Sequence, residues 1–508
     1  MIAYSIVIPT LGRPCLAAML ESLAAARGPA PRRILLVDDR PRDGWPLTVP
    51  PPLASCTDIL TAGGRGPAAA RNMGWRAADT PWVVFLDDDV RVAPDWREAL
   101  AAALDGLADR IAGVQGLVSV PLPADRRPTD WERGTAGLAR ARWITADMAY
   151  RRDALVECGG FDERFPRAFR EDADLALRVL ADGWRLETGW RRTEHPVRPA
   201  SAWISVKTQR GNADDALMRA VHGPGWPERA GETRGRRTRH LAIVGAALTA
   251  AGLAVAGLRR SAATAATAAF GGIAEFAAAR IIPGPRTAKE VATMAATSVL
   301  IPPAAVWHWA RGTWRSRCAR PWPAPPKAIL FDRDGTLIED EPYNGDPDKV
   351  VLVPTARDAV ELARSRGLRI GVVSNQSGIA RGLVSPAQVT AVNDRVEELL
   401  GPFGTWQVCP HGPDDGCSCR KPEPGMVRQA ADELGVDPAD CVVIGDIGPD
   451  LAAAHAAGAR GVLVPTAQTR HEELAGARIA ADLREAVEIA LGVTSAALYW
   501  PGEPGAVR

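Results

Sequence analysis

The chain has 508 residues, which at about 150 residues per domain predicts roughly three domains rather than one large core. Its 61 basic and 60 acidic residues leave a net charge of +1, so we expect no general attraction to nucleic acid. An apolar fraction of 46% and a charged fraction of 24% are ordinary for a globular protein and exclude a disordered or collagen-like chain.

Residues 1–225 alternate short apolar runs with helical stretches. The runs at residues 5–8, 33–37 and 82–86 are continuous and rich in β-branched side chains, as is typical of strands buried on both faces of a parallel sheet. Helices are expected over residues 15–26 and 67–78. We therefore predict a doubly wound α/β domain whose site lies beyond the carboxyl ends of its strands. The first run lacks a basic flank and is too short for a signal peptide, so a cytoplasmic location is expected.

Carboxylates follow the predicted strands of this first domain. Asp87, Asp88 and Asp89 come directly after residues 82–86. An oxygen-only cluster suits Mg2+ or Mn2+, which would neutralise a departing pyrophosphate, whereas the alternative is a solvated acidic turn. Glu171 and Asp172 open a predicted helix, where they offer a general base or merely complement the helix dipole.

Taken in order, these segments resemble the family 2 glycosyltransferases with the GT-A fold. The motifs are Ser5–Thr10, Asp38-Asp39, Ala70–Gly74, Asp87–Asp89, Gly159–Glu163 and Glu171-Asp172. The resemblance implies inverting transfer from a nucleotide-diphosphate sugar. It implies that Pro9, Asp39, Arg71, Asp88 and Glu171 contact the nucleotide sugar, that Asp87 and Asp89 bind its metal, and that Asp172 deprotonates the acceptor. His195 is a further candidate for the metal or the pyrophosphate, with a structural role as the alternative.

Residues 226–325 differ from both flanking regions. Leu241–Leu258 is uncharged, and further apolar stretches cover residues 262–279 and 291–309, the last interrupted by Pro302-Pro303. Eighteen residues just suffice for a membrane span, but seven alanines and three glycines weaken the drive to insert. Arginines on both sides give no clear orientation. We predict membrane association through residues 241–309, as a short hairpin or as interfacial helices; the alternative is an Ala-rich helical domain. A Pro-rich linker, residues 320–326, follows.

Residues 326–493 repeat the α/β pattern, with strand-like runs at 328–331, 370–374, 442–444 and 461–464 and a tail at 494–508. Asp332 and Asp334 follow the first run two residues apart. One acid of such a pair can attack phosphorus while the other transfers a proton; the alternative is an acidic turn. Later runs are followed by polar and charged groups suited to a phosphoryl ligand and Mg2+, namely Ser374, Asn375, Arg420, Lys421, Asp446 and Asp450.

These segments resemble the haloacid dehalogenase-like phosphatases. The resemblance implies that Asp332 forms an aspartyl-phosphate and that Asp334 protonates the leaving oxygen and then activates water. It also implies that Thr336, Ser374, Asn375, Arg420 and Lys421 hold the phosphoryl group. Mg2+ is then expected on Asp332, Asp446 and the backbone carbonyl of Asp334.

Three thiols and an imidazole lie close together just before Arg420. Cys409, His411, Cys417 and Cys419 have the ligand number and softness for tetrahedral Zn2+, with free thiols as the alternative. No position is left for water, so a structural ion is expected, and the eight cysteines of the chain are too sparse for a disulfide scaffold.

With this loop and residues 374–382, the second domain resembles the D-glycero-D-manno-heptose 1,7-bisphosphate phosphatases, with histidinol-phosphate phosphatases as the competitor. Ile447 departs from the lysine that the heptose enzymes often carry there. Short spacings between the motifs leave no room for a large cap domain. The combined prediction is a bifunctional enzyme that acts on a nucleotide-sugar donor and a sugar bisphosphate, with a membrane surface or a lipid-linked acceptor as a partner. One alternative makes one of the two domains an inert scaffold.

Overall fold

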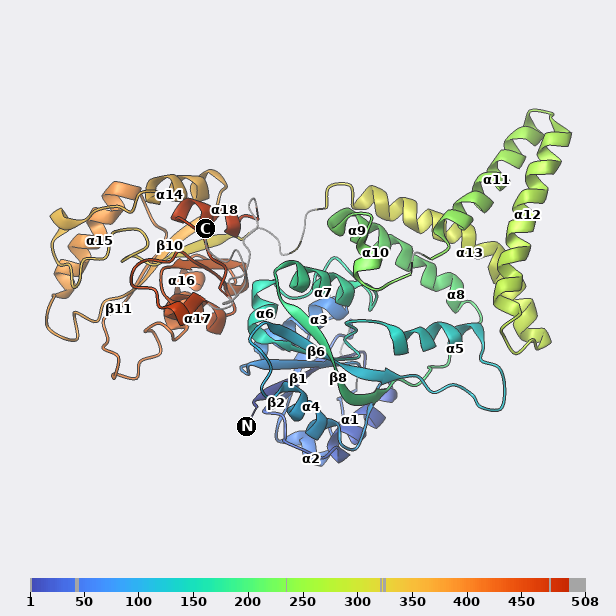
Figure 1. Cartoon of the computed structure of the whole chain (residues 1–508), viewed down its shortest axis with the longest axis horizontal. Helices are drawn as coiled ribbons and strands as arrows, with labels where there is room; N and C mark the ends of the chain where they lie inside the picture. Colours follow the sequence, from blue (N-terminus) through green and yellow to red (C-terminus); the bar gives the residue numbers. More distant parts are fainter. Residues whose placement is uncertain are drawn as a thin grey trace.

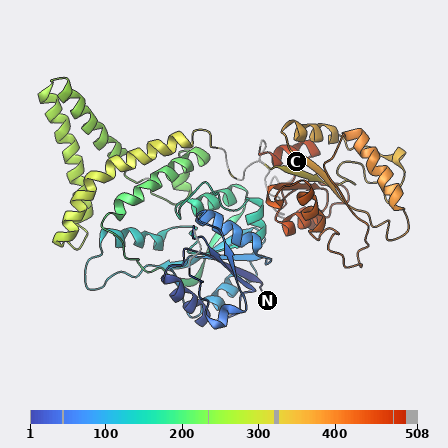
Figure 2. The same cartoon turned by 180° about the vertical axis from the view of Figure 1, so that it is seen from behind.

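The computed structural model describes residues 2–41, 45–233, 235–319, 322, 326–474 and 477–492. The predicted linker, apart from Trp322 and Pro326, and the predicted tail at 494–508 lie outside the described residues. Two α/β domains flank a helical region, as Figure 1 shows and Figure 2 repeats from behind. The prediction of two Rossmann-like domains joined by an Ala-rich helical segment is confirmed.

The N-terminal domain is built on an eight-stranded sheet with the order β3-β2-β1-β4-β7-β6-β8-β5. The three predicted strands are its parallel centre, with Val7 opposite both Leu35 and Phe85. Strand β7 pairs antiparallel with β4, so the sheet is mixed. The strands are β1 Tyr4–Thr10, β2 Arg33–Asp38, β3 Thr57–Thr61, β4 Trp82–Leu86, β5 Arg91–Val92, β6 Ile111–Ser119, β7 Asp147–Arg151 and β8 Arg185–Glu194.

Helices cover both faces of this sheet. Along β1, Ile6 and Ile8 point into one apolar core while Val7 points into the other, which is the two-residue period of a strand. Burial on both faces explains why the central strands read as continuous apolar runs. The helices are α1 Cys15–Ala25, α2 Pro51–Ala54, α3 Pro67–Ala77, α4 Trp96–Leu104, α5 Asp130–Thr135, α6 Arg152–Glu157 and α7 Glu171–Ala181.

The C-terminal domain has a five-stranded, wholly parallel sheet with the order β11-β10-β9-β12-β13. All four predicted strands are present. The strands are β9 Ala328–Phe331, β10 Arg369–Asn375, β11 Trp406–Cys409, β12 Cys441–Gly445 and β13 Arg460–Leu463; the helices are α14 Ala356–Ser365, α15 Pro386–Leu400, α16 Gly425–Glu433, α17 Gly448–Ala457 and α18 Leu483–Ala490. Between β9 and β10 the described chain forms only a short 3-10 turn and α14, so no cap domain intervenes there.

The helical region contains α8 Ile204–Lys207, α9 Asn212–His222, α10 Trp226–Arg229, α11 Arg237–Val255, α12 Arg259–Ile281 and α13 Ala288–Arg315. Helices α11 and α12 form an antiparallel hairpin that stands away from the rest of the molecule (Figure 1). Helix α13 crosses the base of this hairpin and packs along α9. The expected interruption at Pro302-Pro303 is wrong, because α13 continues through both residues. Burial of Ile301, Pro302 and Ala305 in this packing offsets the backbone hydrogen bonds that proline cannot make.

The two α/β domains meet through a buried carboxylate. Glu157, at the end of α6, is 1% exposed and lies 2.7 Å from His455 Nε2 and 2.7 Å from Arg478 Nε. Arg478 also pairs with Asp182 at 2.5 Å. Burial alone would raise the pKa of Glu157, but His455 and Arg478 outweigh it and lower the pKa, so the carboxylate stays ionised. We call these four residues the docking network.

Candidate active sites and metal centres

The carboxyl ends of the N-terminal strands surround a cavity of about 860 Å³, which we call the donor cavity. Every residue that the sequence assigned to the first site lines it: Pro9, Asp39, Arg71, Asp87, Asp88, Asp89, Glu171, Asp172 and His195. These residues come from β1, β2, α3, β4, α7 and β8 or the turns that follow them, which is the placement expected for an open α/β sheet.

Arg71 ties two of the predicted motifs together. Its guanidinium is 1% exposed and donates to Asp87 Oδ1 and to Glu171 Oε1, both at 2.8 Å. Arg71 lies on α3, Asp87 follows β4 and Glu171 opens α7. A buried arginine bound to both acids fixes their relative positions, because breaking either pair would leave a charge buried without its partner. Arg71 therefore orients Asp87 at the cavity wall.

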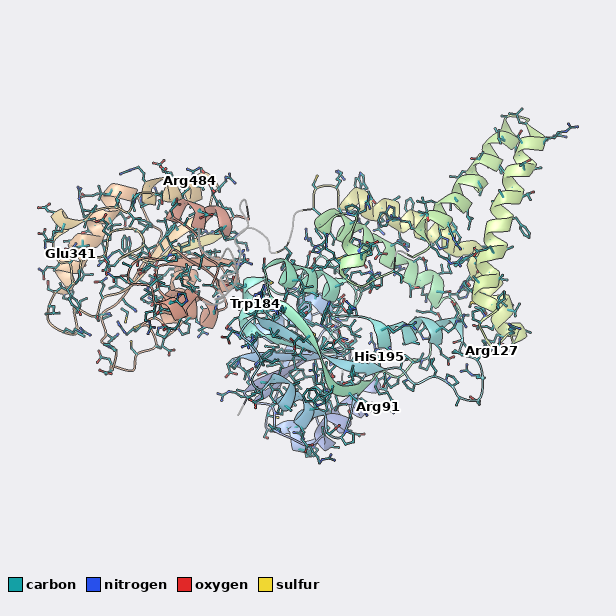
Figure 3. All side chains as sticks on the ribbon, in the orientation of Figure 1. Arg91, Arg127, Trp184, His195, Glu341 and Arg484 are labelled. Atoms are coloured by element: carbon teal, nitrogen blue, oxygen red, sulfur yellow. The ribbon has the colours of Figure 1, made fainter. Side chains whose placement is uncertain are left out.

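Asp87, Asp89 and His195 form a cluster that suits a divalent metal. One potential ligand atom of each lies within 4.8 Å of the others. His195 directly follows β8 and is labelled in Figure 3. Its Nε2 atom lies 3.4 Å from Asp89 Oδ1, and Arg198 Nε lies 2.9 Å from Asp89 Oδ2. Two carboxylates and an imidazole are a donor set for Mn2+ or Mg2+, so the residues present fit the predicted ion.

The acids at the start of α7 have perturbed protonation. Burial, with the neighbouring Asp172, raises the pKa of Glu171 to about 8. Burial likewise raises the pKa of Asp172 above its ordinary value. A carboxylate with a raised pKa is a stronger base than an exposed one, which suits Asp172 to proton abstraction near neutral pH.

The carboxylates of two other predicted residues, Asp39 and Asp88, differ in the hydrogen bonds that they already accept from the protein. Asp39 accepts a hydrogen bond from Gly66 N at 2.9 Å, while its buried Oδ1 atom has no hydrogen-bond partner among the described residues. Asp88 is occupied within the protein, because it accepts from Thr10 Oγ1 at 2.7 Å and from Leu11 N at 3.4 Å. Asp39 thus has an oxygen available for a ligand, and for Asp88 the nucleotide contact stays a prediction.

The second site lies at the carboxyl ends of β9, β10 and β12. Asp332, Asp446 and Asp450 cluster there, each at most 7% exposed. Lys421 Nζ lies 2.7 Å from Asp332 Oδ1 and 2.6 Å from Asp450 Oδ1. Burial raises the pKa of Asp332 to about 8 and that of Asp446 to about 6. Three buried carboxylates with one ammonium group are a donor set that fits Mg2+.

Asp334, the predicted acid and base, is held by two neighbours. Arg333 donates to its carboxylate at 2.9 Å and 3.1 Å, and Gln376 Nε2 donates to Oδ2 at 2.6 Å. Gln376 also donates to Ser374 Oγ at 2.9 Å. Asp334 and the hydroxyl of Ser374, which is predicted to bind phosphate, are therefore connected through one amide.

The predicted phosphate-binding residues surround this cluster. Thr336 is 1% exposed and its Oγ1 atom has no hydrogen-bond partner in the described residues, so this hydroxyl is available to a bound oxyanion. Asn375 acts differently, because its amide bonds the backbone of Lys421 in both directions at 3.0 Å and 3.1 Å. It holds Lys421 in place. Arg420 donates to the carbonyl of His411 at 3.3 Å.

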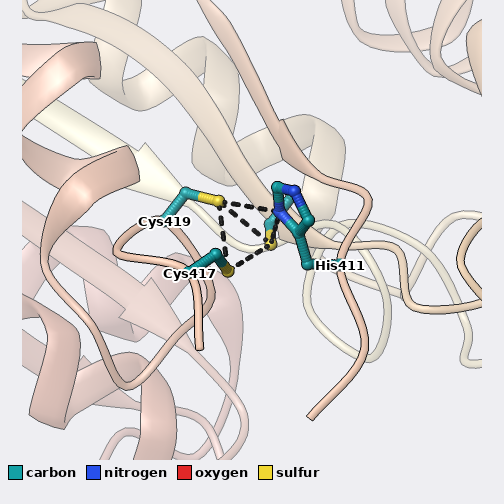
Figure 4. Close-up of side chains that lie close together, drawn as sticks. His411, Cys417 and Cys419 are labelled. Atoms are coloured by element: carbon teal, nitrogen blue, oxygen red, sulfur yellow. Dashed lines mark hydrogen bonds between the residues drawn. The ribbon is translucent and has the colours of Figure 1, made fainter. Parts of the chain in front are cut away.

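The predicted zinc ligands lie together at the end of β11 (Figure 4). Cys419 Sγ is 3.3 Å from Cys409 Sγ, 3.4 Å from Cys417 Sγ and 3.2 Å from His411 Nδ1. These distances exclude disulfides, whose sulfurs are about 2.05 Å apart. A zinc tetrahedron with Zn–S bonds of about 2.3 Å has edges of about 3.8 Å, close to the observed spacing. The four side chains fit Zn2+, and the last of them, Cys419, precedes Lys421 by two residues.

The structure gives three residues contacts that the sequence did not predict. Asp450, expected among the groups suited to Mg2+, pairs with Lys421, and Gln376, which follows Ser374 and Asn375, donates to Asp334. Arg198 was not predicted at the site at all. Arg198 meets Asp89 across more than a hundred residues, and no local pattern predicts that contact.

Comparison with known proteins gives independent matches for the two α/β domains. Residues 5–160 match glycosyl transferase family 2, and residues 418–486 match the HAD-hydrolase-like family. The D-glycero-beta-D-manno-heptose-1,7-bisphosphate 7-phosphatase of Pseudomonas aeruginosa is 40% identical over 143 residues, covering 27% of this chain and 80% of the relative.

Two solved structures are also similar. One is the D,D-heptose 1,7-bisphosphate phosphatase from B. bronchiseptica complexed with magnesium and phosphate, 34% identical, with a TM-score of 0.30, covering 33% of this chain and 99% of that one. The other is GalNAc-T7 with UDP, GalNAc and Mn2+, 16% identical, with a TM-score of 0.32, covering 46% of this chain and 55% of that one.

Proposed function

We propose that both catalytic activities of this chain act on phosphorus-linked sugars. The N-terminal part belongs to the family 2 glycosyltransferases, and the C-terminal part belongs to the haloacid dehalogenase-like phosphatases. We assign the transferase to residues 1–225, the membrane-associated region to 226–325 and the phosphatase to 326–493. The observation that carries this proposal is the presence of two complete carboxylate clusters, each beside a fixed cation, at the carboxyl ends of two separate sheets.

For the phosphatase we infer the substrate D-glycero-D-manno-heptose 1,7-bisphosphate, cleaved at the 7-phosphate. The 40% identity to the heptose bisphosphate 7-phosphatase of Pseudomonas aeruginosa supports this assignment. The test is phosphate release by the full-length chain from the heptose bisphosphate and from histidinol phosphate. We expect the bisphosphate to be preferred; preference for histidinol phosphate would establish the competing assignment.

The phosphatase mechanism follows from the positions of two aspartates. Asp332 attacks phosphorus and forms an aspartyl-phosphate, while the bond to the sugar oxygen breaks and Asp334 protonates that oxygen. Asp334 then takes a proton from water, whose oxygen attacks phosphorus; the bond between phosphorus and Asp332 breaks, which releases phosphate and restores the Asp332 carboxylate. Arg333 and Gln376 orient Asp334 throughout. Asp332, Asp446 and the carbonyl of Asp334 would hold Mg2+, which would supply positive charge to offset that of the phosphoryl group.

In the transferase, Asp172 takes the proton of an acceptor hydroxyl, whose oxygen attacks the anomeric carbon of the donor with inversion. The bond to the nucleoside diphosphate breaks at the same carbon. Asp87, Asp89 and His195 would hold a divalent ion, which would offset the charge of the departing diphosphate. Arg71 keeps Asp87 and Glu171 in place.

The fusion supports a single pathway. Removal of the 7-phosphate leaves a sugar 1-phosphate, which is the form needed for activation by a nucleotide, so we infer that the transferase uses a nucleotide-activated heptose. Transfer assays with a panel of nucleotide sugars test this link. Use of other nucleotide sugars without any use of an activated heptose would contradict it.

We also propose that the α11–α12 hairpin enters a membrane. The three helices α11 to α13 are long and apolar enough to cross one. Leu248, Val255 and Phe270 are 68%, 91% and 73% exposed, as expected for side chains that face lipid. On α12, no charged residue lies between Arg260 and Glu275, a length of about 21 Å at 1.5 Å per residue. This length is somewhat less than the thickness of the hydrocarbon core of a membrane. Because a hairpin returns to its own side, both catalytic domains lie on one side.

Membrane flotation tests the hairpin. We expect the chain to float with vesicles and the double variant Leu248→Glu/Phe270→Glu to remain largely in the soluble fraction, since each buried carboxylate costs about 2.5–3.5 kcal/mol. Leu383→Glu, at a 56% exposed position of the phosphatase domain, is the matched control. Equal flotation of the double variant would contradict insertion.

The zinc loop predicts a selective effect of metal loss. Cys417→Ser removes one of the four ligands, and we expect bound zinc to be lost and phosphate release to fall at least tenfold, because the loop positions Lys421. Glycosyl transfer should be retained. Bound metal is measured by elemental analysis; Cys56→Ser, at a partly buried cysteine of the transferase domain, is the control. Unchanged zinc in Cys417→Ser would contradict the assignment.

A further inference from the structure

We propose that the acceptor of the transferase is a lipid-linked saccharide with an anionic linkage, and that its apolar chain binds in a second cavity beside the donor cavity. This inference rests on the proposed transferase function. The second cavity, which we call the chain cavity, has a volume of about 960 Å³. It lies between α5, α8, α12 and α13 (Figure 1).

The two cavities adjoin one another. Trp131, Gly134, Arg198 and Thr208 line both the donor cavity and the chain cavity. The proposal therefore places the reacting hydroxyl of the acceptor at Asp172 and its chain on the other side of these shared residues. No nucleotide sugar needs both cavities at once, since the donor cavity alone has about 860 Å³ and ligand pockets are typically about 300–1,000 Å³.

Most of the apolar side chains that line the chain cavity belong to the proposed membrane region. Phe276, Met294 and Ile301 line it from α12 and α13, and Ile204 lines it from α8 of the transferase domain. Phe276 follows Glu275, the residue that pairs with Arg236 and Arg239 at the base of the hairpin. The cavity thus lies where the hairpin leaves the body of the protein, so a chain that occupies it can continue directly into the lipid.

Positive charge lies between the apolar wall and the donor cavity. Five cationic side chains line the chain cavity against three acidic ones: Arg126, Arg133, Arg198, Arg280 and Lys289 against Asp130, Glu132 and Glu290. Arg280 is 7% exposed and is fixed by Asp130 and by the hydroxyls of Thr297 and Ser298. Arg198 stands where the cavities join. This excess of charge suits a phosphate linkage between saccharide and chain.

Gly134 offers a test of the passage. It lies in α5, and a Cβ added there meets nothing within 4 Å, so a larger side chain would occupy the open junction. Gly137, three residues later, also has nothing within 4 Å of an added Cβ but lines neither cavity. Gly134→Phe and Gly137→Phe therefore differ mainly in whether the new ring enters the passage.

The experiment is calorimetric titration of the full-length chain with dodecyl phosphate and with inorganic phosphate, in the same uncharged detergent. We expect dodecyl phosphate to bind at least tenfold more tightly than inorganic phosphate, and Gly134→Phe to lose at least tenfold in that affinity while Gly137→Phe keeps it. Equal binding by Gly134→Phe, or equal binding of inorganic phosphate, would overturn the proposal.

Donor chemistry provides the separate control. Slow hydrolysis of nucleotide sugars by the wild-type chain reports on the proposed transferase function alone. Absence of this hydrolysis would contradict the transferase function itself, whereas hydrolysis without tighter binding of dodecyl phosphate would overturn the chain cavity alone.

Discussion

Phosphate release is expected to fall by at least about 10³-fold in Asp332→Asn, because an amide cannot form the acyl-phosphate bond that the mechanism requires. The fold should survive. Asparagine has nearly the shape of aspartate, and the change removes one of two carboxylates that share the Lys421 ammonium group. Asp450 alone then balances Lys421, so no buried charge is left without a partner.

The measurement is single-turnover phosphate release from the heptose bisphosphate, with acid-stable labelling of the protein by the substrate phosphate as a second readout. Glycosyl transfer by the same variant is the internal control and should match the wild-type rate. Turnover retained in Asp332→Asn would refute the covalent mechanism, and a parallel loss of glycosyl transfer would point to misfolding.

Glycosyl transfer is expected to fall by about 10² to 10⁴-fold in Asp172→Asn, which is the usual range for loss of a general base. Asp172 lines the donor cavity and precedes Ala173, whose backbone it contacts, so the side chain is held at the start of α7. Because burial raises its pKa, the wild-type rate should decrease as the pH falls through that raised value and the base becomes protonated.

Initial rates of transfer at saturating donor, measured across a pH series, test this assignment. Asp172→Asn should lose the acid limb of the profile together with most of its rate, while phosphate release stays unchanged. A near wild-type rate in the variant would reject Asp172 as the base. Glu171 is a poor substitute for that role, because its carboxylate is bound to Arg71.

The strands and the site residues on them were predictable because each depends on local sequence. Strands buried on both faces of a parallel sheet have near-continuous apolar runs, and β1, β2, β4 and β9 each contain such a run. Acids that directly follow such strands must gather at one edge, so Asp87, Asp332 and Asp446 could be assigned from sequence alone. The zinc ligands were equally accessible, because all four lie within eleven residues.

Contacts between distant segments could not be predicted in this way. The pairing of Arg71 with Glu171 spans one hundred residues, and that of Arg198 with Asp89 joins a loop to a strand end. In α13 a local rule gives the wrong expectation. Prolines usually interrupt a helix, but packing against α9, α11 and α12 keeps α13 continuous through Pro302 and Pro303. The chain cavity arises between four helices, and no single motif encodes it.

The docking network has a consequence for how this gene can be divided. A cut in the segment between α13 and β9 would leave Glu157 and Asp182 on one fragment and His455 and Arg478 on the other. In each fragment, charged side chains that are paired in the intact chain would lose their partners. Loss of one partner of a buried ion pair costs several kcal/mol of stability. Separately expressed halves should therefore be less stable than the fusion and should recombine when mixed.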